Sequence, residues 1–429
     1  MKFKTELSRK LHDSVVFDLK KDLVKLEGNL KNTDLLLSFQ FKITRNIIRS
    51  ERMIKGLKSF LGELKATKRK GGLKKEQSKL IKENIKSVEQ AIDDVKFKIY
   101  IFKMFGDSVA FLYLDKFDIK HFFYNVVDYS PKESAGYMGG KDGLKEEWEL
   151  VKKACKAGVP TLLNDITMSM RHGDVCLLGE GAPVLVEVKS SQNKNDRVER
   201  QKNNLNRLAE FLAEDKAEDF RGMPLVLRKE LCFSEVTYKK EFNEHLNVCR
   251  KKGISWVRLE DGFYVVSNRG CDLDIALSQL DLRGREIAPI FLNEYKNNQL
   301  WVPLTPFVNL INDARDLCDF INGELTILCV LDLGCFKQIA LNEGFELVFV
   351  DGEDYSMIFK ELGSSLIWGV SWQMMLRTPL EMVSMSWLIK DSIDRFKRLQ
   401  KQHAEMQPAT DVNTSETSLF EKYRPLFTK

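Results

Sequence analysis

Residues 173–191 have the sequence GDVCLLGEGAPVLVEVKSS, and the two short apolar runs within this stretch decide the fold. A turn rich in glycine and proline separates the runs, which is typical of a β-hairpin. Residues two apart on a strand share a face, so Glu187 and Lys189 point the same way. Asp174 opens the first run and lies opposite the end of the second. The hairpin therefore predicts that Asp174, Glu187 and Lys189 converge.

This trio of side chains has a specific chemical use. Two carboxylates can hold Mg²⁺, which prefers hard oxygen ligands. A lysine beside the metal can steady or deprotonate the attacking water. Charges among apolar strand residues are costly unless they are paired or metal-bound. An edge hairpin with a surface Glu–Lys pair has the same pattern, so the flanking segments must separate the two interpretations.

The flanking segments extend the pattern in both directions. Their periodicity predicts helices over 141–158 and 196–215, and strands over 161–170 and 224–233. Glu147 borders the apolar stripe of the first helix, and Gln201 is the one polar member of the stripe on the second. The predicted order is α-β-β-β-α-β, with one polar side chain from each helix directed at the sheet.

This order, with Asp on the second strand and Glu-x-Lys on the third, resembles the PD-(D/E)xK nuclease superfamily, whose restriction-endonuclease-like fold occurs in DNA-cleaving enzymes. The resemblance covers residues 140–230. It implies a metal-binding acid, a second acid, a catalytic lysine, a first-helix acid and a glutamine, which fall on Asp174, Glu187, Lys189, Glu147 (or its neighbour Glu146) and Gln201. Gly173 replaces the proline of the family's name. The implied cofactor is Mg²⁺, with Mn²⁺ as a substitute.

Composition and charge define the wider organisation. The chain has 429 residues, 43% of them hydrophobic, which predicts two or three packed domains. Residues 1–106 carry 26 Lys and Arg against 13 Asp and Glu, a net charge of +13, so the remainder carries −8. A basic arm on an acidic body suggests a polyanionic partner, although solvated faces of long helices have the same composition.

The basic arm has its own periodicity. Apolar residues recur at alternating steps of four and three from Ile81 to Phe102, and a second such seam runs from Ile47 to Leu64. Gly71-Gly72 separates the seams. We expect an antiparallel helical hairpin over about 40–105 with a basic tip, whose seam is satisfied within one chain or by a second chain. A role in assembly would make the protein a homo-oligomer.

The eight cysteines form no CxxC pair, and histidine is scarce, so we expect no zinc site. The chain start has no apolar signal core and no apolar run reaches membrane length, which together predict a cytoplasmic protein without a membrane partner. The C-terminal half favours a mixed α/β domain in which residues 325–351 form a strand, a helix and a parallel strand. The predicted domains are a helical arm (1–106), a nuclease-like domain (107–270), a C-terminal α/β sensing or interaction domain (271–402) and a flexible tail (403–429).

The leading hypothesis is a metal-dependent endonuclease, a phosphodiester hydrolase, that cleaves DNA. By analogy, a stand-alone nuclease with a large accessory half is a candidate bacterial antiviral defence or restriction effector. Two alternatives stay open: a non-catalytic nucleic-acid-binding scaffold assembled through the arm, and a nuclease that cleaves RNA, since the metal chemistry is the same at both phosphates.

Overall fold

The chain is mixed helix and sheet, and it forms two compact units, Met1–Arg228 and Lys229–Lys429. The division differs from the predicted boundary at 270, because strands within 254–268 pair with a later strand of the second unit. The computed structural model describes residues 6–72, 74–134, 136–179, 183–188, 196–228, 231–280, 282–296, 301–350 and 355–402, with the side chains of 6–13, 196–198, 201 and 402 outside the description.

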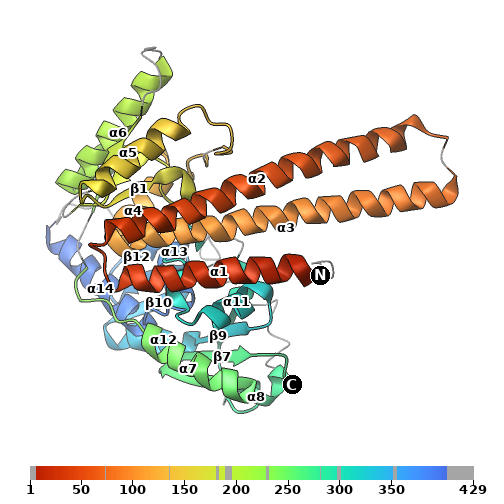
Figure 1. Cartoon of the computed structure of the whole chain (residues 1–429). Helices are drawn as coiled ribbons and strands as arrows, with labels where there is room; N and C mark the ends of the chain where they lie inside the picture. The colour runs from red at the N-terminus through yellow and green to blue at the C-terminus, as the bar shows by residue number, and fades with distance from the viewer. Residues whose placement is uncertain are drawn as a thin grey trace. The chain divides into compact units, whose positions relative to one another are not determined.

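A long antiparallel helical hairpin dominates the first unit, as the heptad pattern predicted (Figure 1). Helix α2 (Thr33–Lys70) and helix α3 (Lys75–Tyr113) run side by side, and α1 (Glu6–Glu27) packs beside them. Gly71 and Gly72 have φ of 71° and 73°, which ends α2. The seam is closed within this chain by a buried cluster of Ile54, Val88, Ile92 and Val95.

Helix α3 does not end at Gly106, where the predicted boundary of the arm lies; it continues to Tyr113. Gly106 serves a different purpose. A Cβ at this position would lie 2.0 Å from the backbone oxygen of Ile166, so only glycine lets the helix approach this segment so closely. The base of the hairpin is thus packed into the body of the first unit instead of forming a separate domain.

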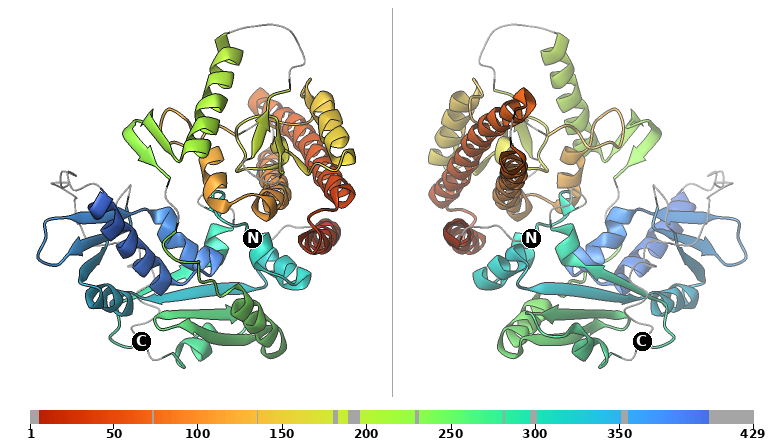
Figure 2. Two further views of the ribbon diagram at one scale, coloured as in Figure 1. Left: turned by 90° about the vertical axis from the view of Figure 1, so that its left-hand side faces the viewer. Right: turned by 90° about the vertical axis from the view of Figure 1, so that its right-hand side faces the viewer.

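The predicted α-β-β-β-α order is present in this unit, with shorter strands. It comprises α4 (Lys116–Phe123), α5 (Leu144–Lys156), β1 (Thr161–Leu163), the 3₁₀ helix η1 (Asn164–Ile166), β2 (Val175–Leu177), β3 (Val184–Val186) and α6 (Asp196–Glu214). The sheet is antiparallel in the order β1-β2-β3, and α5 and α2 pack on β1 (Figure 2). The predicted strand 161–170 is cut short because the chain turns at Asn164, whose amide donates to the oxygens of His172 and Gly173.

The predicted fourth strand belongs to a different sheet. Strand β5 (Met223–Leu227) pairs with β4 (Lys216–Phe220), and no pairing of β5 with β1–β3 is found in the described part of the chain. Arg221 and Gly222, with φ of 57° and 73°, form the two-residue turn that folds β5 back onto β4. The sequence did not predict β4 because its side chains are largely polar. Strand β5 therefore does not join the β1–β3 sheet as the fourth strand that the resemblance implies.

The second unit contains two antiparallel sheets, in the orders β6-β7-β9-β8 and β10-β11-β12. Strands β6 (Ile254–Glu260) and β7 (Phe263–Asn268) form a hairpin that turns at Asp261-Gly262. The predicted parallel unit is wrong, because β9 and β10 lie in different sheets and every described strand pair is antiparallel. The elements are α7 (Lys239–Lys252), β6 (Ile254–Glu260), β7 (Phe263–Asn268), α8 (Leu273–Leu277), β8 (Ile287–Phe291), α9 (Leu292–Tyr295), α10 (Phe307–Leu310), α11 (Ala314–Asn322), β9 (Thr326–Asp332), α12 (Leu333–Asn342), β10 (Phe345–Phe349), β11 (Met357–Glu361), β12 (Ile367–Val370), α13 (Trp372–Glu381) and α14 (Met385–Gln402).

Candidate active site

Asp174 and Glu187 come together at one end of the β2–β3 hairpin. The register pairs Val175 with Val186, and continuing it by one residue places Asp174 opposite Glu187. The amide of Asp174 donates to Val186 O at 2.9 Å, and the amide of Val188 donates to Asp174 Oδ2 at 2.9 Å. The backbone of one strand therefore fixes the carboxylate of the other, and Asp174 and Glu187, two of the three residues predicted to converge, lie together.

The electrostatics of Glu187 reflect this proximity. Burial raises its pKa first, and the negative charge of Asp174 and a hydrogen bond between the two carboxyl groups raise it further. Lys132 and Lys141 act in the opposite direction. Two carboxyl groups held this close favour either a shared proton or a cation between them.

Lys141 lies at the centre of three carboxylates from three different elements. Its Nζ is 2.9 Å from Glu147 Oε1, 2.8 Å from Asp165 Oδ2 and 3.3 Å from Asp174 Oδ1. Burial alone would lower the pKa of Lys141, but its hydrogen bonds to Asp165 and Glu147 raise it above the usual lysine range. We call Glu147, Asp165, Asp174 and Glu187 the acid cluster.

Glu147 is the member of the cluster that comes from α5. Its side chain is 2% exposed, and its Oε2 atom is buried without a hydrogen-bond partner. Burial raises the pKa of Glu147 to about 7, against the hydrogen bond from Lys141. Its neighbour Glu146 is exposed. Of the two acids that the resemblance left open, Glu147 is therefore the one that reaches the cluster.

Glycines and a distant glutamate hold the loop that carries Lys141. Glu51 on α2 accepts hydrogen bonds from the amides of Met138 (3.0 Å) and Gly139 (2.7 Å). Gly140 has φ of 102°, a conformation that favours glycine. The Gly-rich segment is thus a structural loop with a fixed anchor on the helical hairpin, and its function is to place Lys141.

The base of the hairpin also supports the sheet directly. Gln40 on α2, which is fully buried, donates to Thr161 O at 2.8 Å and accepts from the amide of Leu163 at 2.9 Å. Asp107 on α3 accepts hydrogen bonds from the amides of Met168 and Ser169 at 2.9 and 2.8 Å. The segment that precedes β2, and so the position of Asp174, depends on both helices of the hairpin.

A second lysine, Lys132, approaches the acid cluster from the loop before α5. Its Nζ lies 3.4 Å from His172 Nδ1. Burial lowers the pKa of Lys132, and the charges of Glu187 and Asp174 oppose that effect. Burial, followed by the charge of Lys132, lowers the pKa of His172 to about 4. Lys132 therefore adds a second cation to the rim of the cluster.

Two predicted site residues are not placed. Lys189 lies outside the described residues. Gln201 lies on α6, but its side chain is outside the description. One member of the acid cluster, Asp165, and the two lysines beside it, Lys132 and Lys141, were not predicted. The only local signal for Lys141 was its place after a Gly-rich segment, and nothing in the sequence linked 132 or 165 to the hairpin.

The donor set of the cluster fits a magnesium ion. Among the described residues, no three His, Cys, Asp or Glu side chains are grouped to hold one metal ion by themselves. Mg²⁺ does not require such a group, because it keeps several water ligands and is commonly bound by one or two carboxylates plus substrate phosphates. Asp174 and Glu187 supply two carboxylates, and the unpartnered Oε2 of Glu147 is a further acceptor beside them.

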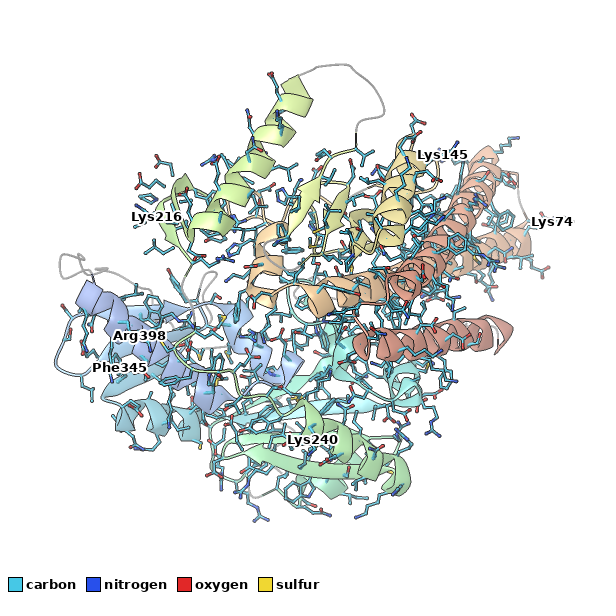
Figure 3. All side chains as sticks on the ribbon, turned by 60° about the vertical axis from the view of Figure 1, so that its left-hand side comes forward. Lys74, Lys145, Lys216, Lys240, Phe345 and Arg398 are labelled. Carbon is cyan, nitrogen blue, oxygen red and sulfur yellow. The ribbon has the colours of Figure 1, made fainter. Side chains whose placement is uncertain are left out.

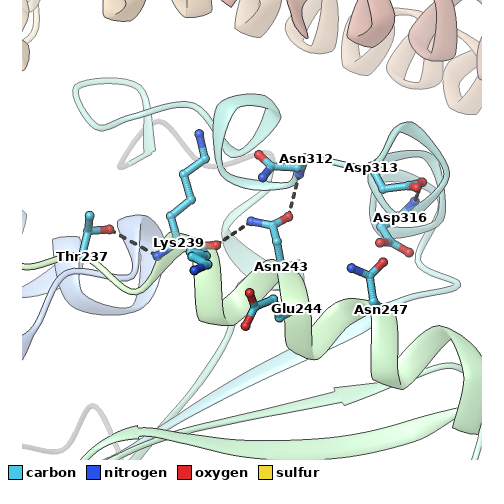
Figure 4. Close-up of a pocket in the computed structure, with 9 residues that line it drawn as sticks. Thr237, Lys239, Asn243, Glu244, Asn247, Asn312, Asp313 and Asp316 are labelled. Carbon is cyan, nitrogen blue, oxygen red and sulfur yellow. Dashed lines mark hydrogen bonds between the residues drawn. The ribbon is translucent and has the colours of Figure 1, made fainter.

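The second unit has a polar hollow of about 630 Å³ along α7 (Figure 4). Several of its lining residues bond to each other or to neighbouring residues. Asn243 donates to Leu310 O at 2.9 Å and accepts from the amide of Asn312 at 2.8 Å, while Asp316 pairs with Arg250. These contacts stabilise the second unit and leave the acid cluster as the stronger candidate for chemistry.

Comparison with known proteins adds no assignment. No protein-family model, no curated protein and no solved structure matches the chain. None of the described helices combines the length and the apolar character needed to cross a membrane.

Proposed function

We propose that the first unit is a metal-dependent endonuclease with a restriction-endonuclease-like core, and that DNA is its substrate. The convergence of Asp174 and Glu187 at the end of β2–β3, with Glu147 from the preceding helix beside them, supports this proposal. The sequence resemblance assigns metal binding to the first two of these acids and a supporting role to the acid of the preceding helix. The alternative of a surface Glu–Lys pair does not explain why these carboxyl groups crowd together.

Each residue has a distinct part in this proposal. Mg²⁺, when bound, supplies the polarisation of the scissile phosphate and a more acidic water. Asp174 and Glu187 would hold it, and the Val188 amide keeps the Asp174 carboxylate in a fixed orientation. Lys189, two residues beyond Glu187, is assigned the stabilisation of negative charge that develops at the phosphate. Lys132 lies close enough to add positive charge at the rim of the cluster.

The test is incubation of the full-length protein with plasmid DNA and with RNA, in Mg²⁺ or in EDTA. We expect cleavage of DNA in Mg²⁺ only. Lys189→Ala and Asp174→Asn should each reduce the rate by about 10²–10³-fold or more, since each removes a preorganised group. If RNA alone is cut, the substrate assignment is wrong. If the wild-type protein and Lys189→Ala leave both nucleic acids intact, the scaffold hypothesis replaces the nuclease.

A matched pair of variants tests the role of α5. Glu147→Gln removes the buried charge next to Lys141, whereas Glu146→Gln removes an exposed charge one residue away. We expect the first to lower the cleavage rate and the second to leave it unchanged. Equal effects of the two variants would mean that the helix contributes only general charge.

We further propose that the hairpin tip contacts nucleic-acid phosphates. Residues 55–86 carry 11 Lys and Arg against 3 Asp and Glu, and Lys74 lies at the far end of the hairpin from the sheet (Figure 3). Because α2 and α3 close the seam against each other, the seam itself does not require a second chain. The assembly role that the sequence suggested therefore has less support than a role in binding a polyanion.

Neutralising the tip should weaken DNA binding in a salt-dependent way. Replacing Lys68, Lys70 and Lys74 with glutamine removes up to three phosphate contacts, so the slope of log affinity against log salt should fall by up to about 3. The matched control replaces three exposed lysines of the second unit, Lys240, Lys251 and Lys252. Equal slopes for the two variants would contradict a specific role of the tip.

A further inference from the structure

Lys141 occupies the place in the acid cluster that best suits a cation. A lysine ammonium has three N–H donors, and three carboxylate oxygens lie within 3.3 Å of this one, on Glu147, Asp165 and Asp174. The three acids come from α5, η1 and the start of β2, so this ammonium neutralises groups that the fold brings together from separate segments. Without it, the four carboxylates would have only more peripheral cations around them, among them Lys132 near Glu187 and Asp174 and Lys103 near Asp165.

One atom in the cluster is left unsatisfied by this arrangement. Glu147 Oε1 accepts from Lys141, but Oε2 is buried without a partner on a side chain that is 2% exposed. A buried carboxylate oxygen without a hydrogen bond is costly. A divalent cation, or a water molecule bound to it, would satisfy this oxygen where the ammonium does not. The cluster is therefore only partly matched to Lys141.

The lysine side chain is able to leave this position without rearranging its loop. Glu51 anchors the loop at Met138 and Gly139, on the N-terminal side of Lys141. The Lys141 side chain is 32% exposed, so its ammonium has a route to solvent. A lysine side chain has a flexible stem of four methylene carbons, and only rotation about its single bonds is needed while the anchored backbone stays in place.

We propose that Lys141 is a resident counter-ion that a divalent cation displaces when it enters the acid cluster. This inference rests on the proposed function, because it concerns the same metal site. In the metal-free protein the ammonium balances the acids and keeps them together. When metal binds, Lys141 moves to the rim, where its positive charge is directed to the substrate phosphates. Metal affinity is then set by an exchange of cations rather than by entry into an empty site.

The decisive experiment uses the wild-type, full-length protein without nucleic acid. Lysines are acetylated briefly with acetic anhydride, with and without Mn²⁺, and each site is quantified by mass spectrometry. Displacement should make Lys141 react faster in Mn²⁺, because an ammonium released from its carboxylates is both more exposed and more readily deprotonated. Lys145, which is exposed in the first turn of α5, is the internal control, and its acetylation rate should not change.

Calorimetric titration with Mn²⁺ gives each outcome a definite meaning. Binding of Mn²⁺ with unchanged acetylation of Lys141 overturns the exchange and makes the lysine a permanent ion pair. Absence of binding overturns the exchange together with the metal-dependent function. Binding with faster acetylation but no cleavage of DNA or RNA supports the exchange and contradicts only the nuclease. The failures of the two proposals are thus distinguishable.

A substitution provides an independent measure of the exchange. Lys141→Met removes the competing charge while keeping a long side chain, and the Mn²⁺ dissociation constant should fall by at least about tenfold. Lys145→Met serves as the matched control and should leave it unchanged. A dissociation constant that rises in Lys141→Met would show that the lysine supports metal binding, which contradicts the proposal. The acetylation experiment needs no variant, so it stands even if Lys141→Met does not fold.

Discussion

Replacing Gln40 with leucine should destabilise the three-stranded sheet at its β1 edge. Strand β1 lies at the edge of the sheet. Pro160 and Asn164, which flank it, bond to Leu178 and Asp174 beside β2, so by the alternation of a strand the backbone groups of Thr161 and Leu163 face away from β2. The Gln40 amide bonds both of these outward groups at 2.8 and 2.9 Å. Leucine has a similar volume and helix propensity, so the substitution removes little besides these two hydrogen bonds.

The expected cost follows from what stays buried. The amide of Leu163 loses its side-chain partner, and Thr161 O keeps only a weak contact from the Cys155 thiol at 4.0 Å. A buried backbone group left without a partner costs about 1–3 kcal/mol, so the two groups together cost about 2–6 kcal/mol at most. Gln90 on α3 is the matched control, because it is exposed and bonds Asp94 at 3.1 Å on the same helix. Gln90→Leu should change stability by no more than about 0.5 kcal/mol.

Hydrogen exchange is the appropriate assay, because it reports on this edge directly, whereas the unfolding curve of a chain of two units reports on each unit as a whole. Amide exchange followed by mass spectrometry reports on the peptides that contain Thr161–Leu163. A local loss of about 2 kcal/mol speeds their exchange about 30-fold. If these peptides exchange equally fast in Gln40→Leu and Gln90→Leu, the edge is not held by this side chain and the argument fails.

Three further predictions test the same support of the site. Gly106→Ala should destabilise the first unit by several kcal/mol, whereas Gly62→Ala, where a Cβ meets nothing within 4 Å, should stabilise α2 by about 0.5–1 kcal/mol, as measured by thermal unfolding. Burial raises the pKa of Asp107 to about 6, so ionisation of this carboxyl group lowers the stability of the folded state as pH rises from the ordinary Asp pKa through 6. In urea titrations, the stability of Asp107→Asn relative to wild type should therefore increase by about 2 kcal/mol between about pH 4 and pH 7.5. A difference that stays constant over this range would refute the prediction. Glu51→Gln loses one of two carboxylate hydrogen bonds, so amides of residues 138–141 should exchange faster while those of the sheet do not.

The features that the sequence predicted correctly are those that depend on local patterns. The convergence of Asp174 and Glu187 follows from the alternation of a strand and from a short turn, both of which are properties of adjacent residues. The α2–α3 hairpin follows from its repeating apolar steps and from the Gly71-Gly72 break. Such features are determined within one or two elements, so they are visible without knowledge of the rest of the chain.

Long-range contacts account for what the sequence did not predict. Lys141 and Asp165 are 24 residues apart, and Gln40 and Thr161 are 121 residues apart, with no pattern that links them. The predicted arm ends at residue 106, but Gly106 lies inside a helix, where it allows a close approach that only the folded structure reveals. Strand β4 has a largely polar sequence and was not predicted, so the pairing of β5 with β4 was not predicted either.

The dependence of the sheet on the hairpin has a consequence for the order of folding. Synthesis releases α2 and α3 before any strand, and a helical hairpin forms quickly because its contacts are local. The strands β1, β2 and β3 have three residues each, and β1 finds partners for its outward groups on a helix made 121 residues earlier. We therefore expect the hairpin to act as a template on which the sheet assembles. A circular permutation that places the hairpin after the sheet would leave the β1 edge open during synthesis, where it could pair with other chains and aggregate.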